Sequence, residues 1–150
     1  MKPPTEFPMT PTHGSYLTPR FEDARVYDAM RKGIFTCPPD TSLREVAQMM
    51  ATYHIHSVVV TDLDGEQPWG LLSAIDLVRS VGPEFLDRTA GESAATEVVT
   101  VMSDDTIDHA AQLMAEHDTG HVLVLHSTTG NPVGIVSTLD VAGVLAWGEG

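Results

Sequence analysis

Residues 70–76 of this chain read Gly-Leu-Leu-Ser-Ala-Ile-Asp, and residues 134–140 read Gly-Ile-Val-Ser-Thr-Leu-Asp. The two stretches lie 64 residues apart, and the match extends without a gap toward the N-terminus. Between residues 36 and 76, twelve of 41 positions are identical to the residue 64 positions later, whereas average residue usage would give roughly two or three. The chain therefore carries two copies of one unit. We expect a pseudo-two-fold structure with a ligand at the seam between its halves.

Each copy shows the same series of predicted elements. Apolar residues recur at helical spacing from Leu43 to Met50 and again from Ile107 to Met114, which predicts two equivalent amphipathic helices. Ser42 with Glu45 is a predicted capping box, and Asp105 or Thr106 is the predicted cap of the second helix. The remaining predicted elements are strands around 34–36, 57–61, 69–73, 98–101, 121–125 and 133–137, and closing helices at 74–80 and 138–146.

This order predicts a mixed α/β (α+β) fold of two tandem β-α-β-β-α repeats with pseudo-two-fold symmetry. The Val-rich strands are apolar on both faces, so we expect them to be buried on both sides. A further helix is predicted from Phe21 to Arg31. The expected boundaries are a flexible N-terminal arm at 1–20, repeat 1 at 21–80, a linker at 81–93 and repeat 2 at 94–146, forming one compact module.

The charge is strongly acidic, with 8 Lys and Arg against 21 Asp and Glu and a formal net charge of −13. No Lys or Arg follows Arg88, and such a surface repels a polyanion, so we expect no nucleic-acid partner. No apolar run is long enough to span a membrane, and the N-terminus has no apolar core of a secretory signal. Cys37 is the only cysteine. These features favour a cytoplasmic protein without a membrane partner.

The Ser-x-x-Asp of each closing motif has two interpretations. It is a capping box in which Asp bonds back to the helix start. Alternatively, an ionised carboxylate at a helix N-terminus accepts hydrogen bonds from the vicinal hydroxyls of a ribose, as in dinucleotide-binding folds. Gly70 and Gly134, three residues before each Ser, would let a ligand approach the backbone. The sequence alone leaves both interpretations open.

The repeat resembles the cystathionine β-synthase (CBS) domain, and the pair resembles a tandem CBS module. The resemblance covers about residues 26–146. It depends on the apolar-x-Thr stretches Ile34-Phe35-Thr36 and Val98-Val99-Thr100, the amphipathic helix with a central Ala, the Val-rich strand, and the closing Gly-h-h-Ser-x-x-Asp, where h is apolar. Two complete sets in register make the resemblance specific.

The resemblance implies a regulatory module that binds adenosine-containing ligands in clefts between the two repeats. It implies AMP, ADP, ATP or S-adenosylmethionine as a regulatory ligand, with no obligatory cofactor, and a homodimer paired through helices. In the family the closing Asp holds the ribose hydroxyls, and the early Thr with its apolar neighbour lines the base and phosphate region. The matching positions are Ile34, Thr36, Ser73, Asp76, Val98, Thr100, Ser137 and Asp140.

The sequence departs from the family pattern in two places. Val59 and Leu123 stand where many members have Pro, which is a conservative change. Phosphate-binding cations are also scarce. Arg79 follows Asp76 by three residues and is a candidate phosphate contact, whereas Gly143 occupies the matching position of repeat 2. We therefore predict unequal sites, with the Asp76 site tolerating phosphate and the Asp140 site degenerate or limited to lightly charged adenosine ligands.

The histidines allow further interpretations. His54 and His56 precede a strand of repeat 1, and His117 and His121 bracket the matching corner of repeat 2. Three interpretations remain open. The histidines are ordinary polar residues at a helix–strand corner, or they form a zinc site. In the third interpretation, His56 and His121 contact phosphate and bind it more strongly when protonated.

Catalysis has no support in the sequence. There is no nucleophile elbow, no Cys–His arrangement with an evident base and no Gly-rich phosphate loop, so we expect a protein that is not an enzyme. The favoured hypothesis is a stand-alone sensor of adenosine nucleotides that acts in trans on an unknown effector protein. The alternatives are a ligand-free structural dimerisation module and a metal-responsive regulator.

Overall fold

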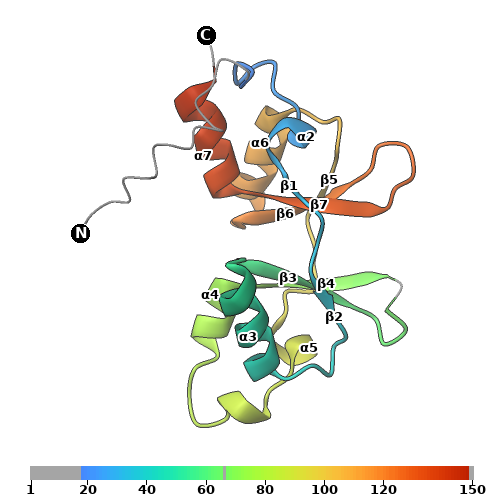
Figure 1. The fold of residues 1–150 in the computed structure, drawn as a ribbon, viewed down its shortest axis with the longest axis vertical. Helices are drawn as coiled ribbons and strands as arrows, with labels where there is room; N and C mark the ends of the chain where they lie inside the picture. The colour runs from blue at the N-terminus through green and yellow to red at the C-terminus, as the bar shows by residue number, and fades with distance from the viewer. Residues whose placement is uncertain (1–17, 66, 149–150) are drawn as a thin grey trace, which may run out of the picture. The chain divides into compact units, whose positions relative to one another are not determined.

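The structure is a computed structural model that describes residues 18–65 and 67–148. Residues 1–17, most of the predicted arm, lie outside this part. The described chain divides into two compact units, one formed by residues 34–98 and one by residues 18–33 together with 99–148 (Figure 1). The two units are called the middle unit and the terminal unit below.

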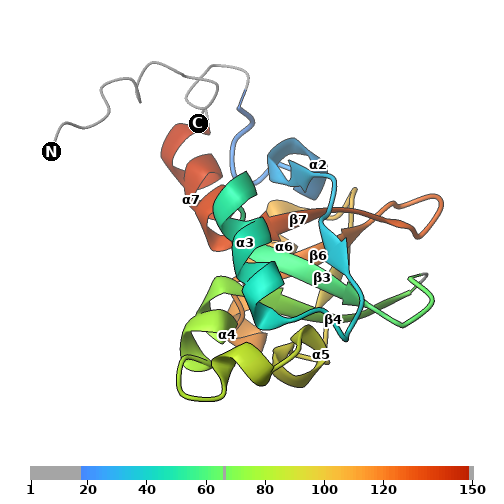
Figure 2. The same ribbon diagram turned by 60° about the horizontal axis from the view of Figure 1, so that its bottom comes forward.

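The middle unit contains a three-stranded sheet with helices on one face. Strands run in the order β2-β3-β4, with β2 parallel and β4 antiparallel to β3, and α3 lies across the sheet (Figure 2). Its elements are β2 (Thr36–Cys37), α3 (Leu43–Tyr53), β3 (Ser57–Thr61), β4 (Pro68–Ser73), α4 (Ala74–Arg79), the 3-10 helix η1 (Phe85–Asp87) and α5 (Ala90–Ser93).

The terminal unit repeats this arrangement with one additional strand. Its sheet has the order β1-β7-β6-β5, and α6 and α7 pack against β6 and β7. Its elements are α2 (Val26–Ala29), β1 (Arg31–Lys32), β5 (Thr100–Met102), α6 (Ile107–His117), β6 (His121–Leu125), β7 (Pro132–Ser137) and α7 (Thr138–Trp147). The mixed fold and the repeated β-α-β-β-α order are therefore confirmed.

Each unit has its own cluster of buried apolar side chains. In the middle unit the cluster joins α3 to β3 and β4, with Leu43, Val46 and Leu72 fully buried. In the terminal unit it joins α6 and α7 to the sheet through Ile107 and Val136. Residues 58–60 and 122–124 are all buried, which matches the burial expected for strands that are apolar on both faces. Val59 and Leu123, which stand where many family members have Pro, are each 1% exposed.

Local signals in the sequence explain where the long helices begin and end. Ser42 Oγ accepts a hydrogen bond from the Glu45 N–H at 3.1 Å, and Thr106 Oγ1 accepts one from the His109 N–H at 3.1 Å. The first confirms the predicted capping box, and the second identifies Thr106 rather than Asp105 as the cap. Both helices end at a residue with left-handed backbone, His54 (φ 54°) and Asp118 (φ 50°).

The helix predicted from Phe21 to Arg31 is wrong in extent. Only the four residues of α2 are helical, because Met30 adopts an extended backbone (ψ 152°) and the chain continues into β1. The predicted linker at 81–93 contains η1 and α5. Thr89 and Glu92 form a capping box at the start of α5. With four residues, α5 is too short to show a hydrophobic periodicity in the sequence.

The role expected for the two motif glycines is corrected by the structure. A Cβ atom on Gly70 would lie 2.9 Å from the carbonyl oxygen of Ala95, and Ala95 pairs with Leu71 through hydrogen bonds of 2.9 and 3.0 Å. A Cβ atom on Gly134 would clash with the carbonyl of Arg31. Arg31 and Ala95 are themselves 64 residues apart, so the glycines admit equivalent protein segments, not a ligand.

Candidate functional site

The two closing motifs have nearly the same geometry at the point where the last strand of each repeat meets its last helix. At the β4–α4 corner, Asp76 Oδ2 accepts hydrogen bonds from the Ser73 N–H at 2.8 Å and from Ser73 Oγ at 2.9 Å. At the β7–α7 corner, Asp140 Oδ2 accepts the equivalent bonds from Ser137 at 2.8 and 3.0 Å. The capping interpretation of both motifs is therefore present in the structure.

Capping uses one oxygen of each carboxylate. Within residues 18–65 and 67–148, Oδ1 of Asp76 and Oδ1 of Asp140 form no hydrogen bond, and both side chains are half-buried. A carboxylate has about four acceptor positions. Each aspartate thus retains acceptor capacity while Oδ2 holds the side chain in a fixed orientation. The ligand role of these residues stays a prediction, but capping does not exclude it.

The predicted histidines lie beside these corners. The backbone carbonyl of His56 accepts a hydrogen bond from the Ala74 N–H at 2.8 Å, so His56 adjoins the first residue of α4, and its side chain is exposed. His121 is the register partner of Ser137 across β6 and β7. The structure therefore brings one histidine to each motif, although the two are not at equivalent positions of the repeat.

The predicted threonines lie farther from the aspartates of their own units. Thr36 pairs with Val59, which pairs with Leu71, so Thr36 lies two strand spacings from β4, about 10 Å. Thr100 is the equivalent residue on β5, opposite Leu123. Both threonines are exposed. Their apolar neighbours, Ile34 and Val98, are half-buried and precede the strands.

The cation predicted for phosphate lies on the expected helix. Arg79 is the last residue of α4, three residues beyond Asp76, and its side chain is exposed. In the described part of the chain its guanidinium forms no hydrogen bond or ion pair. Gly143, at the matching position of α7, has open space where a Cβ atom would stand.

The metal alternative gains no support. Among the described residues, no three His, Cys, Asp or Glu side chains come together as a metal site. Cys37 is buried and unpaired. Burial raises the pKa of its thiol, Glu45 and Asp40 act in the same direction, and a hydrogen bond with Thr41 opposes them.

Sequence reasoning missed a groove on the terminal unit. A space of about 500 Å³ opens between the end of α6 and the start of α7. It is lined by Ala111, Met114, Ala115, Asp118, Thr119, Gly120, Thr138 and Val141. Thr119 and Gly120 correspond to the bulkier Ile55 and His56 of repeat 1. This loss of side-chain volume is the signal in the sequence that could have pointed to the groove.

Comparison with known proteins gives consistent results. The family model described as CBS domain matches residues 26–82 and 92–146. A CBS-domain-containing protein of Agrobacterium tumefaciens has a similar solved structure, with a TM-score of 0.72 and 29% identity over 81% of this chain and 93% of that chain. A CBS domain protein of Pyrobaculum aerophilum, solved in complex with AMP, has a TM-score of 0.70 and 28% identity over 81% of this chain and 98% of that one.

A curated relative is longer than this chain. It is an uncharacterized protein of Methanocaldococcus jannaschii, 26% identical over 122 residues, which are 81% of this chain and 40% of the relative. The chain thus spans less than half of that relative. Among the described residues, no helix combines the length and the apolar character needed to cross a bilayer.

Proposed function

Because the chain belongs to the CBS domain family, we propose that it is a regulatory module that binds adenosine-containing nucleotides at its strand–helix corners. The observation that carries the proposal is the geometry of Asp76 and Asp140, each held by its own Ser while one oxygen stays open. The AMP complex of the Pyrobaculum aerophilum protein, 28% identical to this chain, supports an adenosine ligand.

The proposed contacts follow from the chemistry of a ribose. The 2′- and 3′-hydroxyls donate to Oδ1 of the closing aspartate, and charge-assisted bonds of this kind are about twice as strong as neutral ones. The first-turn N–H groups of the ten-residue helix α7 add a partial positive charge at its corner. The exposed Thr36 and Thr100, with Ile34 and Val98, are proposed to contact the base and phosphate region. His56 and His121 are proposed as additional phosphate contacts.

The two sites are proposed to be unequal. Arg79 gives the β4–α4 corner an exposed cation for a phosphate, whereas Gly143 gives the β7–α7 corner none. The terminal unit does carry cations, because Arg31 and Lys32 of β1 pair with Ile135 and Gly134 of β7, but helix α7 has none. The Asp76 site is therefore expected to accept AMP, ADP or ATP, and the Asp140 site to accept at most lightly charged ligands such as adenosine or S-adenosylmethionine.

Signalling is proposed to occur in trans through an effector protein, from a homodimer. Exposed apolar side chains support the dimer: Ile75 (52%) and Val78 (64%) on α4, and Leu139 (74%) and Leu145 (63%) on α7. A ligand can shift the arrangement of such an assembly only through different affinities for two states. Sedimentation velocity of Val78→Glu and Leu139→Glu tests the dimer, since a charge at a buried interface favours the monomer.

The ligand role is tested by separating it from capping. Ser73→Ala and Asp76→Ala both break the capping box of α4, but only the second removes the open acceptor. We expect Ser73→Ala to bind AMP and Asp76→Ala to lose at least tenfold in affinity by calorimetry. The same pair at Ser137 and Asp140 tests the other corner. Equal AMP affinity in Ser73→Ala and Asp76→Ala would contradict the assignment.

A ligand panel tests the function as a whole. AMP, ADP, ATP and S-adenosylmethionine, each at one hundred times its dissociation constant, should stabilise the protein by about 2.7 kcal/mol. For a chain of this size that is a rise in Tm of roughly 5–11 °C. 2′-Deoxy-AMP should bind more weakly than AMP because it lacks one hydroxyl of the diol. If millimolar ligands leave Tm unchanged, the ligand-free dimerisation module becomes the better explanation, with the Ser–Asp pairs acting only as helix caps.

A further inference from the structure

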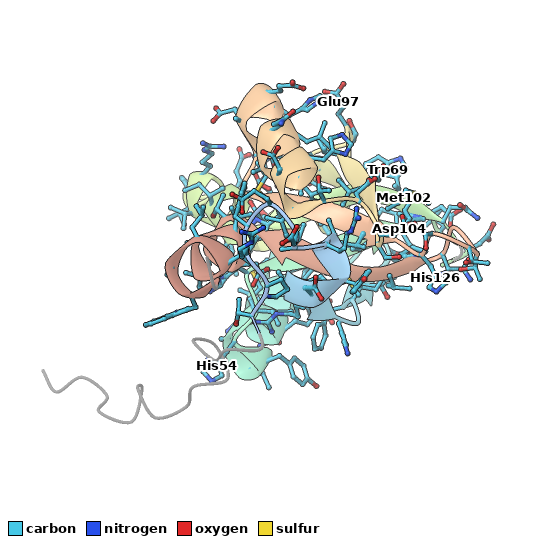
Figure 3. The ribbon with its side chains drawn as sticks, turned by 90° about the horizontal axis from the view of Figure 1, so that it is seen from above. His54, Trp69, Glu97, Met102, Asp104 and His126 are labelled. Carbon is cyan, nitrogen blue, oxygen red and sulfur yellow. The ribbon has the colours of Figure 1, made fainter. Side chains whose placement is uncertain are left out.

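The turn between β6 and β7, residues 126–131, is organised around one histidine ring. The N–H groups of Thr128 and Thr129 both donate to His126 Nδ1, at 3.0 and 3.3 Å. A ring nitrogen that accepts a hydrogen bond carries no proton, so the folded turn needs a neutral imidazole with its proton on Nε2. Figure 3 shows His126 near the far end of the hairpin. This turn therefore contains a structural acceptor that disappears when the ring binds a second proton.

The same turn is tied to the loop that follows β5. The Ser127 N–H donates to Ser103 Oγ at 3.0 Å, and the Ser103 N–H donates to the Leu125 carbonyl at 2.8 Å. Ser103 is one of the few buried polar residues in the described part of the chain, 7% exposed. A change in the turn next to His126 thus reaches a buried residue that directly follows strand β5.

We propose that protonation of His126 opens this turn and makes the β6–β7 hairpin a pH-responsive element of repeat 2. Repeat 1 has Asp62 at the equivalent position, where Asp62 Oδ1 accepts a hydrogen bond from the Gln67 N–H at 3.4 Å. A carboxylate remains an acceptor through the pH range in which imidazoles titrate. The response is therefore confined to one of the two repeats.

Other charged groups near the turn must be separated from His126. Residues 127–131 have no charged side chain. The loop after β5 contributes Asp104 and Asp105, and Asp105 Oδ2 lies 3.5 Å from Nδ1 of a second imidazole, that of His109. Strand β1, paired with β7, contributes the exposed cations Arg31 and Lys32. His109 is therefore the competing titrant.

The experiment is a nitrogen-15 NMR titration of the full chain from pH 8 to 5.5. At pH 8 we expect the His126 ring to be the Nε2–H tautomer, with Nδ1 shifted as an acceptor. As the pH falls, the amides of Thr128 and Thr129 should shift along the titration curve of His126, and their protection from exchange should fall on the order of tenfold. His109→Asn should leave this curve in place, whereas His126→Asp should abolish it.

Two results would overturn the proposal. One is a wild-type His126 ring with its proton on Nδ1 at pH 8, an observation that needs no variant to fold. The other is the loss, in His109→Asn, of the pH-dependent shifts of the Thr128 and Thr129 amides. That result would assign the response to the His109–Asp105 pair. Neither result depends on any nucleotide, so the test is independent of the proposed ligand.

Discussion

Replacing Gly70 with Ala tests the inference that the motif glycine exists to admit a neighbouring segment of protein. The new Cβ would lie 2.9 Å from the Ala95 carbonyl oxygen and 3.2 Å from the Ala94 Cβ. Backbone atoms cannot rotate away as a flexible side chain can, so the Leu71–Ala95 bridge must shift. Overpacking of this kind costs about 1–3 kcal/mol, which for 150 residues corresponds to a fall in Tm of roughly 2–12 °C.

The assay is urea unfolding followed by tryptophan fluorescence. Trp69 precedes Gly70 on β4 and reports on the middle unit, while Trp147→Phe removes the other tryptophan. Gly143→Ala is the matched control, because nothing lies within 4 Å of its Cβ position in helix α7. Since α7 belongs to the terminal unit, its unfolding is followed by Trp147 in a Trp69→Phe background. The control should stabilise by about 0.5–1 kcal/mol through helix propensity. A Gly70→Ala variant as stable as the parent would refute the reasoning and reopen the glycine as a ligand approach.

Three further predictions address local features of the fold. Ser42→Ala should cost about 1 kcal/mol because it removes the cap of α3, measured by chemical denaturation, and no loss would contradict the capping box. His54→Gly and Asp118→Gly should each stabilise by about 0.5–1 kcal/mol, since both positions have left-handed backbone that glycine adopts without a Cβ clash; a lower Tm in both would count against this. Burial raises the pKa of the Cys37 thiol, so a thiol reagent at pH 8 should modify the native protein much more slowly than the denatured chain. Because burial raises the thiol pKa only in the folded state, the free energy of unfolding is unaffected below the ordinary thiol pKa of about 8.5 and falls as the pH rises above it. Cys37→Ala should remove that fall. Equal slopes of stability against pH in the parent and in Cys37→Ala would contradict the prediction.

The regular parts of the fold could be predicted from the sequence because the same pattern of elements is present in both repeats. Strands β3 and β6 have the predicted bounds, and α3 and α6 begin where the apolar periodicity begins. Because the same apolar pattern occurs twice, 64 residues apart, it leaves little freedom in the register of the strands. The closing Ser–Asp pairs also took the predicted capping geometry, since capping depends only on residues three apart.

The parts that could not be predicted depend on contacts between distant residues. Nothing local marks Arg31 and Lys32 as a strand, because they are exposed and pair only through the backbone with β7. The groove beside Gly120 likewise arises from side chains that are small relative to repeat 1. His126 was visible as a histidine, but its role as a backbone acceptor depends on the path of a turn that residue type alone does not determine.

The division of the chain into a middle and a terminal unit has a consequence for synthesis on the ribosome. Residues 34–98 are contiguous, so this unit is complete once its 65 residues have emerged, which takes roughly 3–13 s at typical translation rates. Residues 18–33 must instead wait until all of 34–147 has been made, which takes roughly 6–23 s. During that interval the nascent chain exposes Val26 and Ala24, which end fully buried. Ala24 and Val26 therefore cannot be buried in the terminal unit until translation has reached its last helix.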